Sequence, residues 1–165
     1  MELHCKDFIF ITDDSGLTDV SSKTAMESNG WVFKKECKKE GCGTKGCGTA
    51  NWYEVDDKKV CGTASWYCSG SKAEGSISAK FKSSGSATLD FGNCYKKGIV
   101  VVNLNGARKS AAKAKVPSKS INFEFVTGDE LKIIEKEGGI INLNSFKVQG
   151  EKLNVYCIIL SRRIL

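Results

Sequence analysis

Cysteine is the residue type in this 165-residue chain that is most able to build a covalent or metal-centred site, and it occurs eight times. An even count in a glycine-rich stretch is typical of a disulfide framework formed in an oxidising compartment. We therefore predict a secreted, extracellular protein, although the chain as given shows no signal peptide, because its apolar patch at Phe8 to Ile11 is too short for one. The expected disulfide cysteines are Cys37, Cys42, Cys47, Cys61, Cys68 and Cys94, with a candidate Cys5–Cys157 bridge between the two ends of the chain.

Zinc is the alternative partner for these thiols. Four of them, Cys42, Cys47, Cys61 and Cys68, could act as thiolate ligands. Four residues separate the first pair and six the second, whereas compact zinc sites use shorter spacings. We therefore favour disulfides over zinc.

Carboxylates and histidine decide whether the chain could hold calcium or catalyse a reaction. Candidate Ca²⁺ ligands are Asp13 with Asp14, or Asp56 with Asp57, and we expect no other cofactor. The only histidine, His4, lies beside the N-terminus, which argues against a Ser-His-Asp or Cys-His site. A glycosidase-like carboxylate pair stays open as the weakest of our hypotheses, so we predict a protein that is not an enzyme.

Two Trp-Tyr pairs are the candidate ligand-binding residues. They follow a repeated Cys-Gly-Thr-Ala at Cys47 and Cys61, and they comprise Trp52, Tyr53, Trp66 and Tyr67. We interpret them as aromatic side chains presented by two disulfide-anchored loops, where aromatic faces could stack on sugar rings. The alternative is that they anchor the loops on the core. Trp66 is the more probable core residue and Trp52 the better ligand candidate.

A basic strip lies further along the chain, whose net charge is +6. Its residues are Lys96, Lys97, Arg108, Lys109, Lys113, Lys115 and Lys119, with no acid between them. Such a strip could bind sulfated glycans, phosphates or acidic surfaces, but lysines also protect exposed sheet edges from aggregation, and we favour that simpler interpretation. Because the strip and the aromatics lie in different segments, we predict no nucleic-acid binding.

The elements that must position these residues are strands. Apolar residues recur with a period of two from Gly75 onward, for example at Ile77, Ala79 and Phe81. No segment gives a convincing helix pattern, and no apolar run is long enough to span a membrane. Asn105-Gly106 predicts a type I′ hairpin turn. The apolar phase changes between Leu143 and Phe146, which predicts a β-bulge near Asn144-Ser145.

These patterns predict an all-β, antiparallel β-sandwich or barrel with a loop-rich, disulfide-stapled first half. Cys94, at the corner after one strand, is expected to clamp that first half to the sandwich through Cys68 or Cys61. We expect one domain over 1–150. Residues 151–165 form a tail that is either an extra strand or foreign to the domain.

A resemblance supports this architecture. The segments at Trp66 to Cys68, Gly75 to Ser78, Ala87 to Cys94, Val100 to Gly106, Gly128 to Leu131 and Asn144 to Phe146 match landmarks of a known module. Over about 28–149 the chain resembles a cysteine-containing β-sandwich module found in secreted and cell-surface proteins of cnidarians, sponges and some protists. The resemblance implies a jelly roll similar to galactose-binding-like domains and an extracellular setting, and it transfers no catalytic residues.

The sequence therefore predicts a secreted, lectin-like jelly roll that recognises a glycan or another cell-surface or matrix ligand. A structural or cell-adhesion module acting in protein–protein assembly is the alternative, and a carbohydrate-active enzyme is the weaker one. The sequence does not fix the oligomeric state.

Overall fold

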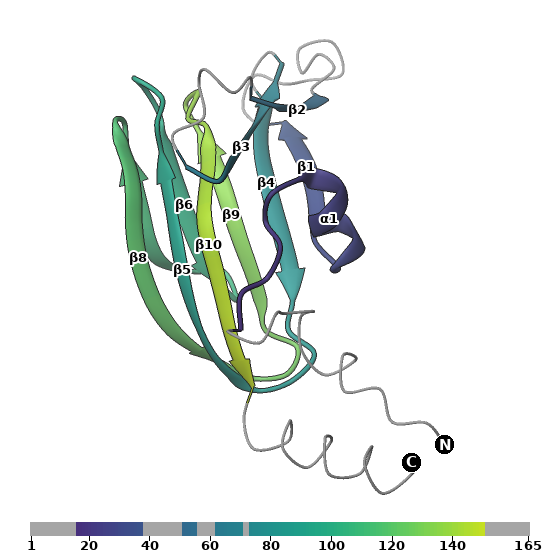
Figure 1. Ribbon diagram of the computed structural model, residues 1–165. Helices are drawn as coiled ribbons and strands as arrows, with labels where there is room; N and C mark the ends of the chain where they lie inside the picture. The colour runs from purple at the N-terminus through teal and green to yellow at the C-terminus, as the bar shows by residue number, and fades with distance from the viewer. Residues whose placement is uncertain (1–15, 38–50, 56–61, 71–72, 151–165) are drawn as a thin grey trace, which may run out of the picture.

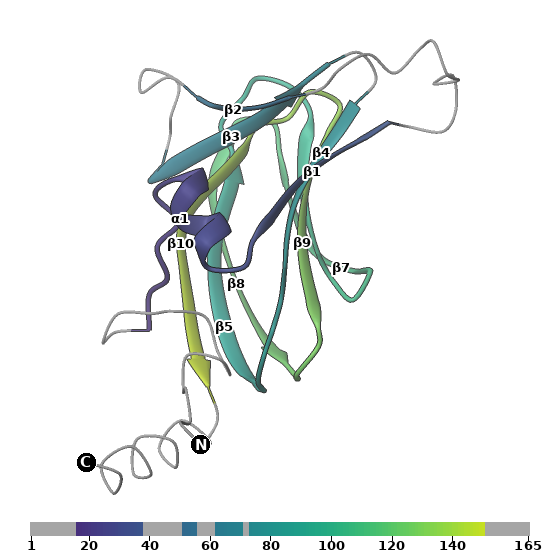
Figure 2. The same cartoon turned by 90° about the vertical axis from the view of Figure 1, so that its right-hand side faces the viewer.

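A computed structural model describes residues 16–37, 51–55, 62–70 and 73–150. In these residues two five-stranded antiparallel sheets stack face to face (Figures 1 and 2). The first sheet has the strand order β1-β4-β9-β6-β7 and the second β2-β3-β10-β5-β8. The strands are β1 (Val32–Cys37), β2 (Asn51–Glu54), β3 (Ala64–Ser69), β4 (Ala73–Lys80), β5 (Gly85–Asn93), β6 (Ile99–Leu104), β7 (Ala107–Lys113), β8 (Val116–Phe125), β9 (Glu130–Lys136) and β10 (Ile141–Gly150).

Strands β3 to β10 have the winding of a jelly roll. The pairings are nested: β3 pairs with β10, β4 with β9, β5 with β8, and β6 with β7. The chain changes sheet at each connection in this run except the central β6–β7 hairpin. This nesting of eight strands in two sheets is a jelly roll. The predicted all-β, antiparallel jelly-roll fold is confirmed.

The segment before β3 adds to both sheets and also contains a helix that the sequence pattern did not predict. β1 extends the first sheet next to β4, and β2 extends the second next to β3. The helix α1 (Lys23–Ser28) lies beside β1 at the side of the sandwich (Figures 1 and 2). Ser22 caps it by accepting a hydrogen bond of 3.1 Å from the Ala25 N–H, and Met26 is its fully buried anchor. Six residues are too few to produce a helical period, so only the Ser22 cap signals it.

The predicted β-bulge is confirmed. β10 pairs with β5 through Leu143 opposite Phe91 and then through Ser145 opposite Asp90, so that Asn144 is the extra residue. Phe146 consequently returns to the interior, where it is fully buried. The bulge keeps the apolar side chains on either side of it in one core.

The predicted hairpin turn is also confirmed. Asn105 and Gly106 have φ angles of +50° and +77°, as a type I′ turn requires, and they connect β6 to β7. The β6 strand is nearly continuous in buried residues, as expected for a strand near the centre of its sheet.

The predicted clamp between Cys68 and Cys94 is wrong. The structure contains no disulfide between these two cysteines. β10 separates β3 from β5, so the two backbones are about two strand spacings, or roughly 10 Å, apart, beyond the reach of a disulfide. Cys37 ends β1, but its side chain lies outside what the structure describes, as do the remaining predicted disulfide residues Cys5, Cys42, Cys47, Cys61 and Cys157.

Candidate functional site

The two Trp-Tyr repeats form paired strands, which corrects their interpretation as loops. β2 and β3 are antiparallel neighbours, and Tyr53 lies directly opposite Tyr67. Because side chains alternate across a strand, the tryptophan and the tyrosine of each pair face opposite sides of the sheet. All four predicted aromatic residues are therefore brought together, but they divide into an inner and an outer set.

The inner set anchors the strands on the core. Trp66 is 1% exposed, as predicted for a core residue. Trp52 also packs against the core, with its ring 5.5 Å from that of Phe33 and in an edge-to-face arrangement. A Cβ atom at Gly75 would lie 2.6 Å from both Trp52 Cη2 and Cys68 Cβ, so glycine leaves the space that Trp52 fills. Trp52 is therefore a packing residue, and its selection as the better ligand candidate is not supported by its position.

The outer set forms an aromatic surface. Tyr53 is 44% exposed and Tyr67 is partly exposed. Their ring centroids are 5.5 Å apart and their planes are inclined by 32°. Two tilted rings side by side, one on the edge strand β2 and one on its neighbour β3, offer a broad apolar face. We call these two residues the tyrosine platform.

A hydrogen-bonded polar network adjoins this platform on the same side of the sheet. Its members Ser65 and Asn142 are buried, whereas Asp90 and Asn144 are half-buried and Ser118 is exposed. The Ser65 hydroxyl donates to Asn142 Oδ1 at 2.7 Å, one alternation along β3 from Tyr67. Asn144 Nδ2 donates to Asp90 Oδ1 at 2.9 Å, and the Ser118 hydroxyl donates to the same oxygen at 2.7 Å. The second oxygen, Asp90 Oδ2, makes no hydrogen bond with a described residue and can accept one from a ligand hydroxyl.

The spacing of the two features sets the size of a shared ligand. Strand geometry places Asp90 roughly 15 Å from Tyr67, across two strands and several residues along them. A ligand must therefore be an extended chain to contact both. Sequence reasoning did not find Asp90, Asn142 or Asn144 as site residues, because their side chains meet only through the register of β3, β10 and β5.

A buried carboxyl group lies beneath β3. Glu135 is 4% exposed and faces the interior from β9. Its Oε1 accepts a hydrogen bond of 2.9 Å from the Cys68 N–H, while Oε2 is buried without a partner. Burial raises the pKa of Glu135 to about 8, against the smaller opposite effect of the Cys68 hydrogen bond. Glu135 is thus protonated at neutral pH, which is how an interior position tolerates it.

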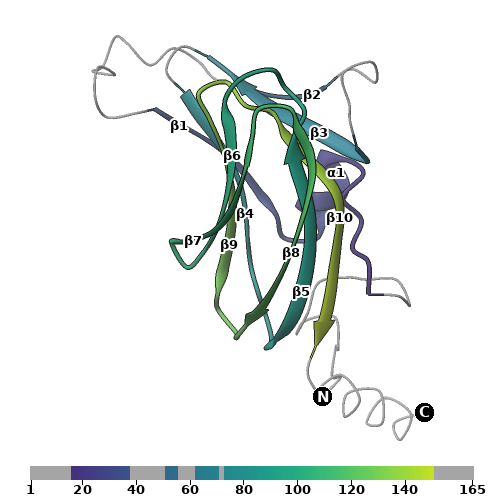
Figure 3. The same cartoon turned by 90° about the vertical axis from the view of Figure 1, so that its left-hand side faces the viewer.

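The predicted basic strip divides into two parts. Lys96, Lys97 and Lys115 belong to touching turns at the end of the sandwich near β2 and β3, and Lys113 ends β7 beside them (Figure 3). Arg108 and Lys109 instead lie along β7 after the hairpin turn, and both are exposed. The seventh residue, Lys119, donates from its Nζ to the Ala111 carbonyl at 3.1 Å.

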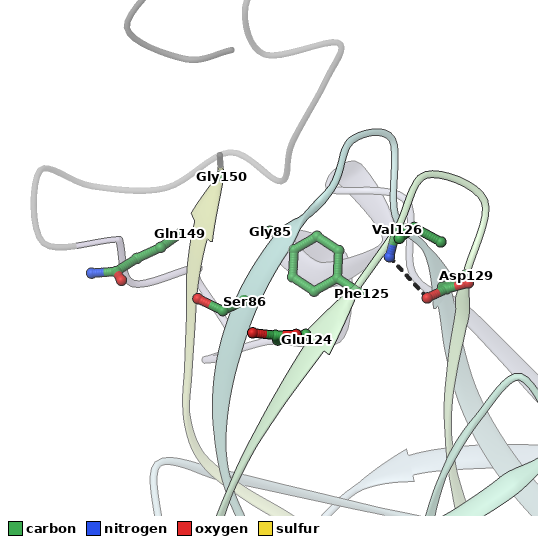
Figure 4. Close-up of a pocket in the computed structure, with 8 residues that line it drawn as sticks. All are labelled: Gly85, Ser86, Glu124, Phe125, Val126, Asp129, Gln149 and Gly150. Carbon is green, nitrogen blue, oxygen red and sulfur yellow. Dashed lines mark hydrogen bonds between the residues drawn. The ribbon is translucent and has the colours of Figure 1, made fainter. Parts of the chain in front are cut away.

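A pocket of about 390 Å³ lies at the opposite end, where β5 begins and β8 and β10 end (Figure 4). Its lining residues are Gly85, Ser86, Glu124, Phe125, Val126, Asp129, Gln149 and Gly150. Asp129 accepts hydrogen bonds from the Val126 N–H at 2.9 Å and from Asn105 Nδ2 at 2.6 Å, and these lower its pKa. Asp129 therefore stabilises a turn. An ionised carboxylate that accepts two hydrogen bonds is a poor general acid.

The candidate calcium ligands Asp13, Asp14, Asp56 and Asp57 lie outside the described residues, as does His4. Within the residues that the structure describes, no cluster of three histidine, cysteine or acidic side chains could hold a metal ion. In the same part of the chain, no helix is long and apolar enough to cross a membrane.

Comparison with known proteins found no matching family model and no matching curated protein. Carbohydrate-binding modules are among the similar solved structures. CBM35 from Paenibacillus barcinonensis is 12% identical, with a TM-score of 0.40 over 73% of this chain and 99% of that one. The C-terminal CBM6 of LamC, a marine laminarinase from Zobellia galactanivorans, is 11% identical, with a TM-score of 0.34 over 72% of this chain and 99% of that one.

A family two carbohydrate esterase from Cellvibrio japonicus is 14% identical, with a TM-score of 0.37 over 73% of this chain and 34% of that one. All three TM-scores are below 0.5, so the fold assignment rests on the strand order and register described above.

Proposed function

We propose that this protein is an extracellular glycan-binding module that stacks sugar rings on Tyr53 and Tyr67. The observation that supports it is the outward-facing, cross-strand tyrosine pair on β2 and β3. Aromatic faces bury the apolar side of a sugar ring. Because paired strands already hold the two tyrosines in place, little conformational entropy is lost when a sugar binds. The network around Asp90 would accept and donate hydrogen bonds to hydroxyl groups further along the same oligosaccharide.

Tyr67→Ala and Tyr53→Ala test this proposal. Each removes one ring from a partly exposed position, so we expect about a tenfold loss of affinity for the best neutral oligosaccharide found on a glycan array. The affinities would be measured by titration calorimetry. Tyr67→Phe keeps the ring and should keep most of the affinity. Ser86→Ala in the end pocket is the matched control and should leave binding unchanged.

The proposal fails if the wild-type protein binds no glycan, or if both alanine variants bind as the wild type does. Affinity loss in Ser86→Ala alone would instead assign sugar binding to the end pocket. Trp52→Ala separates packing from binding: because its ring fills the space above Gly75, we expect it to lower the stability of the fold.

Protein–protein adhesion is the second candidate function. Tyr53 lies on β2, whose outer side pairs with no strand among the described residues, and exposed tyrosines are enriched at protein interfaces. A negative glycan array together with self-association that Tyr53→Ala abolishes would favour this function over sugar binding.

A further inference from the structure

Three turns at one end of the sandwich bring together lysines that are far apart in the sequence. Residues 94–98 join β5 to β6, residues 114–115 join β7 to β8, and residues 137–140 join β9 to β10 (Figure 3). The strand register places Lys113 and Lys136 on either side of Ile99. The cluster comprises Lys96, Lys97, Lys113, Lys115 and Lys136, and we call it the lysine end.

The turns are in direct contact. A Cβ atom at Gly98 would overlap the Gly139 backbone nitrogen and lie 2.6 Å from the Lys136 carbonyl oxygen, so these two turns pack backbone to backbone. The Lys115 N–H donates to the Tyr95 carbonyl at 2.9 Å, which joins the third turn to the first. The fold therefore holds the backbones of these three turns against one another.

Asn93 fixes the first of these turns from below. Its side chain is completely buried. Oδ1 accepts hydrogen bonds of 3.1 Å from the N–H groups of Tyr95 and Ile140, and Nδ2 donates to the Lys97 carbonyl at 3.2 Å. One buried amide thus sets the conformation of the residues that carry Lys96 and Lys97.

No described acidic residue neutralises the positive charge of the lysine end. Among the described residues no carboxylate forms an ion pair with the five lysines, and Glu137 is the only acid in these turns. Lys115 also occupies a left-handed conformation with φ of +64°, which glycine or asparagine adopts more easily.

The lysine end adjoins the tyrosine platform. Because Ile141 lies opposite both Trp66 and Asn93, the preceding residue, Ile140, separates Tyr67 from Cys94. The first lysine turn therefore begins two strand spacings, or roughly 10 Å, from Tyr67. An oligosaccharide bound on the platform can reach it.

We infer that the lysine end binds the anionic groups of a sulfated or carboxylated glycan whose sugar rings stack on Tyr53 and Tyr67. This inference rests on the proposed glycan-binding function and names the class of glycan. The lysine ammonium groups bind sulfate or carboxylate oxygens by charge-assisted hydrogen bonds, and the rings supply the contact that plain polyanion binding lacks.

The experiment uses the full chain and an array of matched oligosaccharides, each present in neutral, carboxylated and sulfated forms on one sugar backbone. The best set is then titrated by calorimetry at low and high sodium chloride. We expect an anionic form to bind at least about tenfold more tightly than the neutral form, with the difference shrinking in high salt. The carboxylated and sulfated arms show which anion is preferred.

A charge-neutral variant and a matched control locate the effect. K96Q/K97Q/K113Q/K115Q removes four exposed charges from the lysine end, and K34Q/K35Q/R108Q/K109Q removes four exposed charges elsewhere. We expect the first variant to lose the preference for the anionic form while it still binds the neutral form. The control should keep the preference.

The inference is overturned if no anionic form gains affinity, if the first variant keeps the gain, or if the control loses as much. It is also overturned if duplex DNA or phosphatidylserine vesicles bind more tightly than every sulfated glycan. Neutral-form binding that depends on Tyr67 would still support the proposed function in each case. Conversely, the anionic form could bind more tightly in a way that depends on the lysines, while Tyr67→Ala changes the affinity of no form. That result would refute sugar stacking on the tyrosine platform and support anion binding at the lysine end.

Discussion

Glu135 makes the stability of this fold depend on pH. Its pKa is about 8 in the folded protein and 4.5 ordinarily, so the folded state holds a proton that the unfolded state has released between these values. The free energy of unfolding that depends on this proton is fully present below pH 4.5. It falls as the pH rises and levels off above pH 8. We expect a loss on the order of 3–5 kcal/mol between about pH 5 and pH 9, measured by urea denaturation.

Glu135→Gln isolates this effect because its amide resembles the protonated acid. The variant should match the wild type within about 1 kcal/mol at acid pH, where Oε1 can still accept from the Cys68 N–H, and exceed it at alkaline pH. Glu27→Gln, on the exposed side of α1, is the control and should follow the wild-type curve. Equal pH dependence in Glu135→Gln and wild type would contradict the assignment.

At the scale of the element, the bulge in β10 is tested by shortening the strand. Deleting Asn144 places Ser145 directly after Leu143, so Phe146 and Val148 keep their inward positions. We expect this variant to fold, with a loss of about 1–3 kcal/mol from the missing hydrogen bonds to Asp90 and Pro117, measured by urea denaturation.

Deleting both Asn144 and Ser145 is the contrasting variant. Phe146 would then follow Leu143 directly and point outward, which exposes a ring that is fully buried in the native fold. This variant should not fold cooperatively. If the double deletion proved as stable as the single one, the bulge would not be the device that sets the register.

The regular strands could be predicted from the sequence because one apolar face repeats every second residue, as at Ile77, Ala79 and Phe81. β2 and β3 escaped prediction for a physical reason. Tyr53 and Tyr67 point outward, yet they are as aromatic as their inward neighbours Trp52 and Trp66, so the alternation does not appear as a change from apolar to polar. The sequence did name Lys96, Lys97, Lys113 and Lys115 as parts of a basic strip. Only the packing of the three turns and the strand register show that Lys136 joins them.

At the scale of the whole molecule, the nested pairing of the described strands leads us to predict that the folding unit ends at Gly150. The last strand, β10, closes the jelly roll by lying between β3 and β5, and it ends at Gly150. At the other boundary, the Val148 N–H donates to the Gly16 carbonyl at 2.8 Å and the Thr18 N–H donates to the Phe146 carbonyl at 2.9 Å. β3 pairs with β10 only from Ile141 to Leu143, and the segment from Gly16 pairs with β10 further along the same side.

These boundaries predict opposite effects for two truncations. A chain that stops at Gly150 keeps each strand of the jelly roll and should unfold within about 2 °C of the full chain. A chain that starts at Val20 loses both hydrogen bonds to β10 and uncovers the edge over Phe146, so its unfolding midpoint should fall by more than about 5 °C. Thermal denaturation followed by circular dichroism distinguishes them. If removing 151–165 lowered the midpoint as much as removing the first nineteen residues, those residues would belong to the folding unit, because only contacts within it add to its stability.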